Sequence, residues 1–363
     1  MKYALKEILY GRKKYILIEL LLILLMFMVL FLSGLASGLG RAVSSAIETM
    51  DADSFIVDDS AEQLITVSSV RTSVLDELRA KGIQASPLDI QRMYIIRDGH
   101  SEKLNVTYFA VEAGSFIEPE TIEGTGLAAS SARDPILLDD DFKLEGISLG
   151  DTVKDPATGL SFTVAGFVDD RMFGHTSVGY ITIDSYTRLR QASDPMYEHI
   201  PHAIAVKGIA DYGFEGNGLE VVPKQKIIEK IPSYTAEHLT ITMIVWVLVI
   251  ISAVIIGIFN YILTLHKQKQ FGVMKAIGMK NTELAGMVIS EVLIISLFAA
   301  LISLALTFSM AAAMPEKMPF YLEVPNAVIV TAAFVLISVL SSMLSVINIS
   351  RIDPMKAIGG GEE

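Results

Sequence analysis

The sequence predicts an α-helical membrane protein with four transmembrane helices and an α+β extracytoplasmic domain between the first and the second. Of its 363 residues, 52% are hydrophobic and only 19% are charged. That composition is too apolar for a soluble domain alone and too polar for a chain lying wholly in lipid. Four apolar stretches reach the roughly 20 residues that cross a bilayer. About 200 residues of mixed polarity, enough for a domain, separate the first two stretches.

The four apolar stretches define the domain organisation that we expect. In chain order the predicted segments are a cytoplasmic interfacial amphipathic helix (1–14), a first transmembrane helix with an extracytoplasmic extension (15–50), the α+β domain (51–238), a second transmembrane helix (239–265), a cytoplasmic helix (266–283), a third transmembrane helix (284–313), an extracytoplasmic loop (314–323), a fourth transmembrane helix (324–349) and a cytoplasmic tail (350–363). The first apolar run is longer than that of a signal peptide and no A-x-A pattern follows it, so we expect a retained span.

Charge predicts the orientation. Lys and Arg gather before the first span, between the second and third, and after the fourth. Because positive residues are retained on the cytoplasmic side, we expect both termini inside and the large domain outside the cell membrane. Regions 38–237 and 315–323 together hold 34 acidic residues against 18 basic ones. A surface of this charge excludes nucleic acid as its ligand.

The large domain alternates strand and helix patterns. Runs rich in β-branched and aromatic residues predict strands, and a Pro- and Gly-containing turn at 155–159 predicts a hairpin. The expected strands are 54–58, 64–70, 88–97, 104–111, 152–153, 160–168, 180–183, 203–206 and 219–222. The expected helices are 74–81, 185–191 and 224–231.

The end of the first span carries a face of mostly small residues. Residues at intervals of three and four lie on one side of a helix. The members of this face are Gly34, Gly38, Arg41, Ser45, Glu48 and Ala52. Small residues allow close packing in lipid. Because no Pro or turn signal precedes Asp51, we expect the helix to continue beyond the membrane.

The sequence lacks several motifs of catalysis and metal binding. It has no G-x-x-x-x-G-K-[ST] phosphate loop and no H-E-x-x-H, it has no Cys, and its six His residues are scattered. We therefore expect a subunit that is not an enzyme. Any ATP-driven work must then be done by a partner chain.

The polar segment between the second and third spans carries a short amphipathic helix. Phe271, Met274 and Ile277 fall on one face, with basic residues around them. We expect Gly278 to end this helix and Asn281 to cap the next. Such a helix on the cytoplasmic face is suited to passing motion from a soluble ATPase into the membrane.

Several stretches resemble the MacB/FtsX-type ABC transporter permeases. They are Gly-Val-Met-Lys-Ala-Ile-Gly at 272–278, Arg-Ile-Asp-Pro-Met-Lys-Ala-Ile at 351–358 and the predicted hairpin strands at 149–153 and 162–169. The order of one span, a large domain and three spans also matches. The segments 1–8 and 31–41 are most similar to the haem-exporter (HrtB) subfamily.

The resemblance implies a multi-pass permease that works as a homodimer in the lipid of the plasma membrane. It implies two copies of a cytoplasmic ATPase subunit, which bind ATP and Mg²⁺. It further implies haem as the exported ligand, with no intrinsic cofactor. The residues that would couple the permease to the ATPase are Phe271, Gly272, Met274, Lys275, Ile277 and Gly278.

A haem site in this chain would need iron ligands other than Cys. Residues of suitable type near the outer membrane boundary are Glu48, Met50, Tyr234 and His238, and Arg41 could pair with a haem propionate. Glu48 and Met50 are about 200° apart on a helix, so both reach one iron only if the helix frays or two subunits contribute. The alternative is that Glu48 is merely solvated and Met50 packs in a core.

Two other functions fit the same pattern. A permease-like chain can transmit force to an extracellular partner, such as a cell-wall hydrolase, without moving a substrate. It can also export peptides, drugs or lipoproteins. The sequence favours haem efflux only through the subfamily resemblance.

Overall fold

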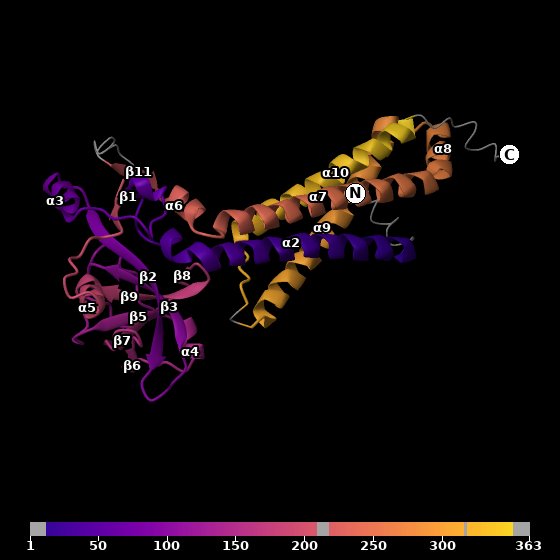
Figure 1. Ribbon diagram of the computed structural model, residues 1–363. Coiled ribbons are helices and arrows are strands. Elements are labelled where there is room, and N and C mark those ends of the chain that lie inside the picture. The colour runs from indigo at the N-terminus through magenta and orange to yellow at the C-terminus, as the bar shows by residue number, and fades with distance from the viewer. Residues whose placement is uncertain (1–11, 209–217, 316–317, 351–363) are drawn as a thin grey trace. The chain divides into compact units, whose positions relative to one another are not determined.

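The computed structural model describes residues 12–208, 218–315 and 318–350. The chain forms two compact units, one of Met1–Gly38 with Leu239–Glu363 and the other of Leu39–His238. We call them the helical unit and the α/β domain. Two helices, α2 (Arg12–Glu48) and α7 (Tyr234–His266), continue from one unit into the other (Figure 1).

The helical unit contains the four predicted apolar helices, which are thereby confirmed. Besides α2 and α7 they are α9 (Asn281–Ala313) and α10 (Val324–Ser350), and each is long and apolar enough to cross a membrane. A short helix, α8 (Gln268–Ala276), joins α7 to α9. Of the predicted interfacial helix (1–14) and cytoplasmic tail (350–363), residues 1–11 and 351–363 lie outside the described residues, whereas residues 12–14 begin α2 and residue 350 ends α10.

Apolar side chains from all four long helices form the core of the helical unit. Met26 and Leu30 of α2 are completely buried, as is Ala299 of α9, and Ile256 of α7 and Phe334 of α10 join the same cluster. Without a hydrophobic driving force between helices in lipid, such close packing supplies much of their association.

The small-residue face of α2 is covered by a loop. A Cβ built on Gly34 would lie 2.5 Å from the Phe320 ring, and one on Gly38 would lie 2.3 Å from the Pro319 carbonyl oxygen. The Tyr321 amide donates to the Gly34 carbonyl at 3.0 Å. The small residues therefore allow close packing, and the segment that packs here is the one between α9 and α10.

In the part of the α/β domain that the structure describes there are eleven strands, whose bounds are as follows. They are β1 (Ser54–Asp58), β2 (Ala85–Arg97), β3 (Leu104–Val111), β4 (Glu123–Gly124), β5 (Pro135–Asp139), β6 (Thr152–Lys154), β7 (Ser161–Val168), β8 (Met172–Phe173), β9 (Thr176–Thr182), β10 (Ala203–Val206) and β11 (Leu219–Pro223). The helices are a 3-10 turn (Asp59–Ala61), α3 (Thr72–Ala80), α4 (Asp141–Leu144), α5 (Ile183–Ser193) and α6 (Lys224–Lys230). The α+β domain predicted for this region is confirmed, since the structure mixes helices with a mostly antiparallel sheet.

The strands pair in the order β11-β1-β10-β2-β3-β9-β5-β7-β4, and β6 pairs with both β2 and β7. The strands β2, β3, β9, β5, β7 and β6 therefore form a closed ring. Within it β3 with β9 and β5 with β7 are parallel, and the other pairs are antiparallel. Closure leaves these strands without a free edge.

The end of α2 belongs to the core of the α/β domain. Val43, Ala46 and Ile47 are completely buried and pack in one cluster with Phe109 of β3. On the other face of β3, Tyr108 packs in a second cluster, as the alternation of side chains along a strand requires. The C-terminal part of α2 is therefore packed into the core of the α/β domain.

Most predicted strands are confirmed, but the expected strand at 64–70 is wrong. Glu62 and Gln63 have φ angles of 51° and 68°, and the amides of Leu64 and Val67 close successive turns. Strand β1, the nearest in sequence, already pairs with β10 and β11 on its two edges. The run at 64–70 therefore has no free edge of β1 to pair with, and its first residues form turns.

Candidate functional site

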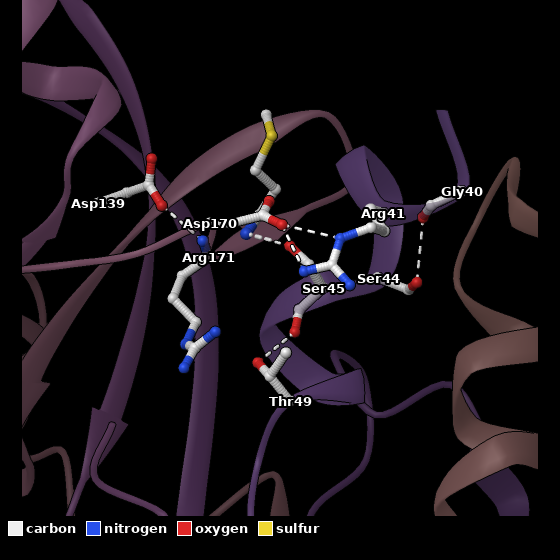
Figure 2. Close-up of polar contacts among 9 residues, drawn as sticks. Gly40, Arg41, Ser44, Ser45, Thr49, Asp139, Asp170 and Arg171 are labelled. Carbon is white, nitrogen blue, oxygen red and sulfur yellow. Dashed lines mark hydrogen bonds and ion pairs between the residues drawn. The ribbon is translucent and has the colours of Figure 1, made fainter. Parts of the chain in front are cut away.

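The β8–β9 hairpin and the residues just before it contact the C-terminal part of α2, at residues 41–45. Arg41 donates through Nε and Nη2 to one carboxylate oxygen of Asp170, at 2.8 and 2.5 Å (Figure 2). The Met172 amide donates to the buried Ser45 hydroxyl at 2.9 Å. The amides of Gly174 and His175 donate to the carbonyls of residues 43 and 42, both at 2.9 Å. Four contacts thus dock the hairpin on one turn of α2.

The same hairpin also reaches the start of α7. Gly174 and His175 have φ angles of 57° and 60°, as a two-residue type I′ turn requires. At this tip the His175 imidazole lies 3.0 Å from the Glu237 carboxylate. Tyr234 packs on the cluster that contains the end of α2, and a Cβ on Gly40 would lie 4.0 Å from its ring. The upper part of α2, the hairpin and the first turn of α7 are therefore mutual neighbours.

Four of the five residues predicted to bind haem lie at this junction. Arg41 is half-buried, Glu48 is the exposed last residue of α2, and the parallel rings of Tyr234 and His238 stack with their centroids 5.7 Å apart. Their role in haem binding stays a prediction. Among the described residues, no group of three or more His, Asp or Glu is positioned to hold a bare metal ion.

The fifth residue, Met50, lies elsewhere. It follows the end of α2, is only 5% exposed and packs in the domain core. The Lys224 ammonium donates to the carbonyls of Glu48 and Met50, at 3.0 Å each, and holds this turn in place. Ligation through the Met50 sulfur would require that side chain to leave the core. Ala52, expected on the same helical face, lies beyond the helix end.

Asp139 lies beneath the hairpin and was not predicted. Its carboxylate accepts the Arg171 amide at 2.5 Å (Figure 2). It also accepts the Asp141 amide at 3.2 Å. Burial raises the pKa of Asp139 to about 8 despite these two hydrogen bonds. Asp139, Asp170 and His175 became relevant only through the hairpin, whose two-residue strand β8 is too short to read from periodicity.

The α8 helix has a packed face and an exposed face. Phe271 is 1% exposed and contacts Leu284 and Val288 of α9. Ile277, by contrast, is 79% exposed, and Val273, one turn before it, is 50% exposed. The face proposed from Phe271, Met274 and Ile277 is thus divided. Its first residue anchors the helix and its last is available to a partner.

The predicted ends of α8 and α9 are partly confirmed. Gly278 follows the end of α8 with a φ of +99°, which suits glycine. Asn281 was predicted to cap α9, but it is the first residue of that helix. The capping position is occupied by Lys280. The Glu283 side chain accepts the Lys280 amide at 2.9 Å and so satisfies one donor at the helix start. Gly272 is buried and Lys275 partly buried.

Comparisons with known proteins agree with the motif resemblance. Residues 242–354 match the family model described as FtsX-like permease C-terminal. The chain is 25% identical over 363 residues to a protein of Staphylococcus haemolyticus, and 26% identical over 362 residues to one of Staphylococcus epidermidis, with complete coverage of all chains. Both carry the provisional name hemin transport system permease protein HrtB.

A solved structure also matches in part. The extracellular domain of the noncanonic ABC-type transporter YknZ is 15% identical, with a TM-score of 0.31, over 46% of this chain and 87% of that chain. The resemblance to FtsX-like ABC permeases of the HrtB type is confirmed by the family model and the full-length relatives. The chain is therefore similar to permease subunits of membrane transport systems.

Proposed function

We propose that this chain is the permease of an ABC-type efflux system that removes haem from the membrane, with ATP hydrolysed by a separate cytoplasmic subunit. The observation that carries the proposal is the full-length similarity to two hemin transport permeases. In the proposed assembly two permease chains form a homodimer with two ATPase subunits. Both termini and α8 face the cytoplasm, and the α/β domain faces outside, as the distribution of Lys and Arg suggests.

The junction of α2, α7 and the hairpin is the proposed haem site. Glu48 offers a carboxylate to the iron, while the stacked rings of Tyr234 and His238 offer an aromatic face to the porphyrin. Arg41 offers its guanidinium to a propionate, which would have to compete with Asp170 for it. Burial of Met50 makes Glu48 the stronger candidate for iron ligation.

Coupling to the ATPase is assigned to α8. Its exposed apolar pair, Val273 and Ile277, is surrounded by lysines and suits a groove in a soluble partner. Phe271 and Gly272 support this surface from within and do not form it. ATP-driven approach of the two ATPase subunits would displace α8, and the helices attached to it would expel the ligand.

Titration of the purified full-length protein with hemin tests the site. We expect a Soret shift that Glu48→Ala weakens, while Met50→Leu, which keeps the core volume, has little effect. Glu102→Ala, an exposed carboxylate on the loop between β2 and β3, is the matched control. The absence of any Soret shift would refute hemin as the ligand. A shift that all variants preserve would refute the site but not the ligand.

A further inference from the structure

A buried ionic cluster in the helical unit links α2, α9 and the residue between α7 and α8. The Lys267 ammonium donates to both carboxylate oxygens of Glu291, each at 2.7 Å, and the Tyr15 hydroxyl donates to one of them. The ammonium also lies 5.5 Å from the centre of the Tyr15 ring. The side chains of Lys267 and Glu291 are only 11% and 5% exposed. The cluster therefore holds two opposite charges away from solvent.

Stabilisation of the helix packing does not by itself explain why these two charges are buried. Burying an ion pair costs several kcal/mol per ion, and well-packed apolar residues of similar volume are often as stable. Glu291 lies ten residues into α9, among apolar neighbours such as Val288 and Val292. Ionisable residues inside membrane helices are by default candidates for function. A charge pair adds geometric specificity to the packing, because each charged group then has one defined partner in one defined arrangement.

The cluster lies where α8 is joined to the long helices, which suggests a role in transmitting the movement of α8. Lys267 is the residue immediately before α8, and Phe271, one turn further, packs on the start of α9. The helix α8 is thus attached to α9 at two points, one ionic and one apolar. The carboxylate of Glu291 is linked through Tyr15 to α2 as well. A displacement of α8 therefore has a direct mechanical path to both α9 and α2.

A second arrangement of the cluster is available beside it. A cavity of about 10 Å³ is lined by Asn260, Thr264, Lys267 and Glu291 among others. This is about the volume that one water molecule needs. Within the described part of the chain, the buried Asn260 amide nitrogen has no hydrogen-bond partner. An unsatisfied donor and space for water allow Glu291 to exchange partners without opening the bundle.

We propose that Tyr15, Lys267 and Glu291 form a joint that passes the displacement of α8 to α9 and α2, and that coupling of ATP hydrolysis to transport depends on it. The proposal rests on the proposed function for its ATPase partner. In the joint, Glu291 is the common acceptor and Tyr15 is the link to α2. Because α2 continues to Glu48, the joint connects the cytoplasmic surface with the proposed haem site along one helix.

The sharpest variant is Tyr15→Phe, which removes one hydroxyl and leaves the ion pair and ring in place. Tyr261→Phe on α7, at a tyrosine that is 45% exposed and outside the cluster, is the matched control. In proteoliposomes with the cognate ATPase, we expect Tyr15→Phe to bind the ATPase and to keep the basal rate of ATP hydrolysis that is measured without hemin. We expect its hemin-stimulated ATPase activity and its hemin release to fall about tenfold, within the range of typical coupling energies.

A hemin-independent measurement separates the joint from its substrate. Because the chain has no Cys, spin labels can be placed at Lys269 of α8 and the exposed Leu24 of α2 without background. Trapping the complex with ATP and vanadate should change the distance between the labels in the parent and in Tyr261→Phe but not in Tyr15→Phe. Lys267→Arg should retain part of the change, since it keeps the charge.

The outcomes are distinct. An unchanged distance shift and unchanged stimulation in Tyr15→Phe would overturn the joint. A shift that depends on Tyr15 in a complex that hemin does not stimulate would support the joint and refute hemin as the substrate. Failure of the chain to assemble with any ABC ATPase would overturn both the joint and the proposed function.

Discussion

Gly38 shows how one hydrogen atom in place of a methyl group decides a contact in this bundle. The Pro319 carbonyl lies against its Cα so closely that a Cβ would lie 2.3 Å from the oxygen and 2.4 Å from the carbon. Both atoms belong to backbone, which cannot move aside as a flexible side chain does. Gly286 of α9 differs, since a Cβ there would meet no atom within 4 Å.

We therefore expect Gly38→Ala to destabilise the protein by about 1–3 kcal/mol, the usual cost of overpacking. Gly286→Ala should be neutral or stabilising by up to about 1 kcal/mol, because alanine is the better helix former. Thermal unfolding of both variants in detergent measures the difference. Equal stability of the two variants would contradict the close approach of the loop to α2.

The buried Asp139 makes the stability of its strand depend on pH. Its pKa is raised to about 8 in the fold by burial, whereas an unfolded Asp titrates near 3.9. The folded domain therefore prefers the protonated acid. This contribution to stability is complete below about pH 4 and is lost as the pH rises through about 8.

Hydrogen–deuterium exchange of the full chain can detect this effect. After correction for intrinsic rates, residues 135–139 should exchange faster at pH 8 than at pH 5. Asp139→Asn, which cannot ionise, should remove most of that difference. If protection of β5 is the same at both pH values in the parent protein, then Asp139 is ionised in the fold and the assignment is wrong.

At the scale of elements, the two ends of α8 have different roles. One end packs on the permease itself, and the other is exposed to a partner. Phe271 lies against α9, whereas Ile277 is exposed at the other end of the helix. A sequence pattern shows that the two share a face, but it does not show how far the neighbouring helix covers that face. The start of α9 covers the first turn of α8 and leaves the last one open.

Ile277→Asp should abolish assembly with the ATPase while leaving the fold intact, because its side chain is exposed. Phe271→Ala should destabilise the permease itself by about 3–5 kcal/mol, the cost of truncating a buried Phe. Co-purification with the ATPase, together with thermal unfolding of the permease alone, distinguishes the two. Normal assembly of Ile277→Asp would show that the contact lies elsewhere.

The sequence predicts elements best where one periodicity decides them. Strand 104–111 and the four apolar helices follow from alternation and length, and they are confirmed. Strand β5 (Pro135–Asp139) was missed because it is buried throughout and shows no alternation. Lys267 was counted only as a cytoplasmic charge, since its partner Glu291 is 24 residues away in another helix. Pairing across elements is not visible in local patterns.

At the scale of the whole molecule, α2 connects the two proposed sites of action. Its first turns hold Tyr15 of the joint, and its last turn holds Glu48 of the proposed haem site. The α/β domain grips that last part through the hairpin and through its own core. A helix anchored at both ends suits a mechanism in which ATP-driven motion on one side of the membrane releases a ligand on the other.

ATP-driven hemin transfer tests this account most directly. Proteoliposomes that contain the permease and its ATPase, loaded with hemin in the bilayer, are mixed with apomyoglobin on the side of the α/β domain. We predict that ATP accelerates the appearance of the holomyoglobin Soret band, and that Glu48→Ala and Tyr15→Phe each lose most of this acceleration. A transfer rate that is the same with and without ATP in the parent protein would contradict the account.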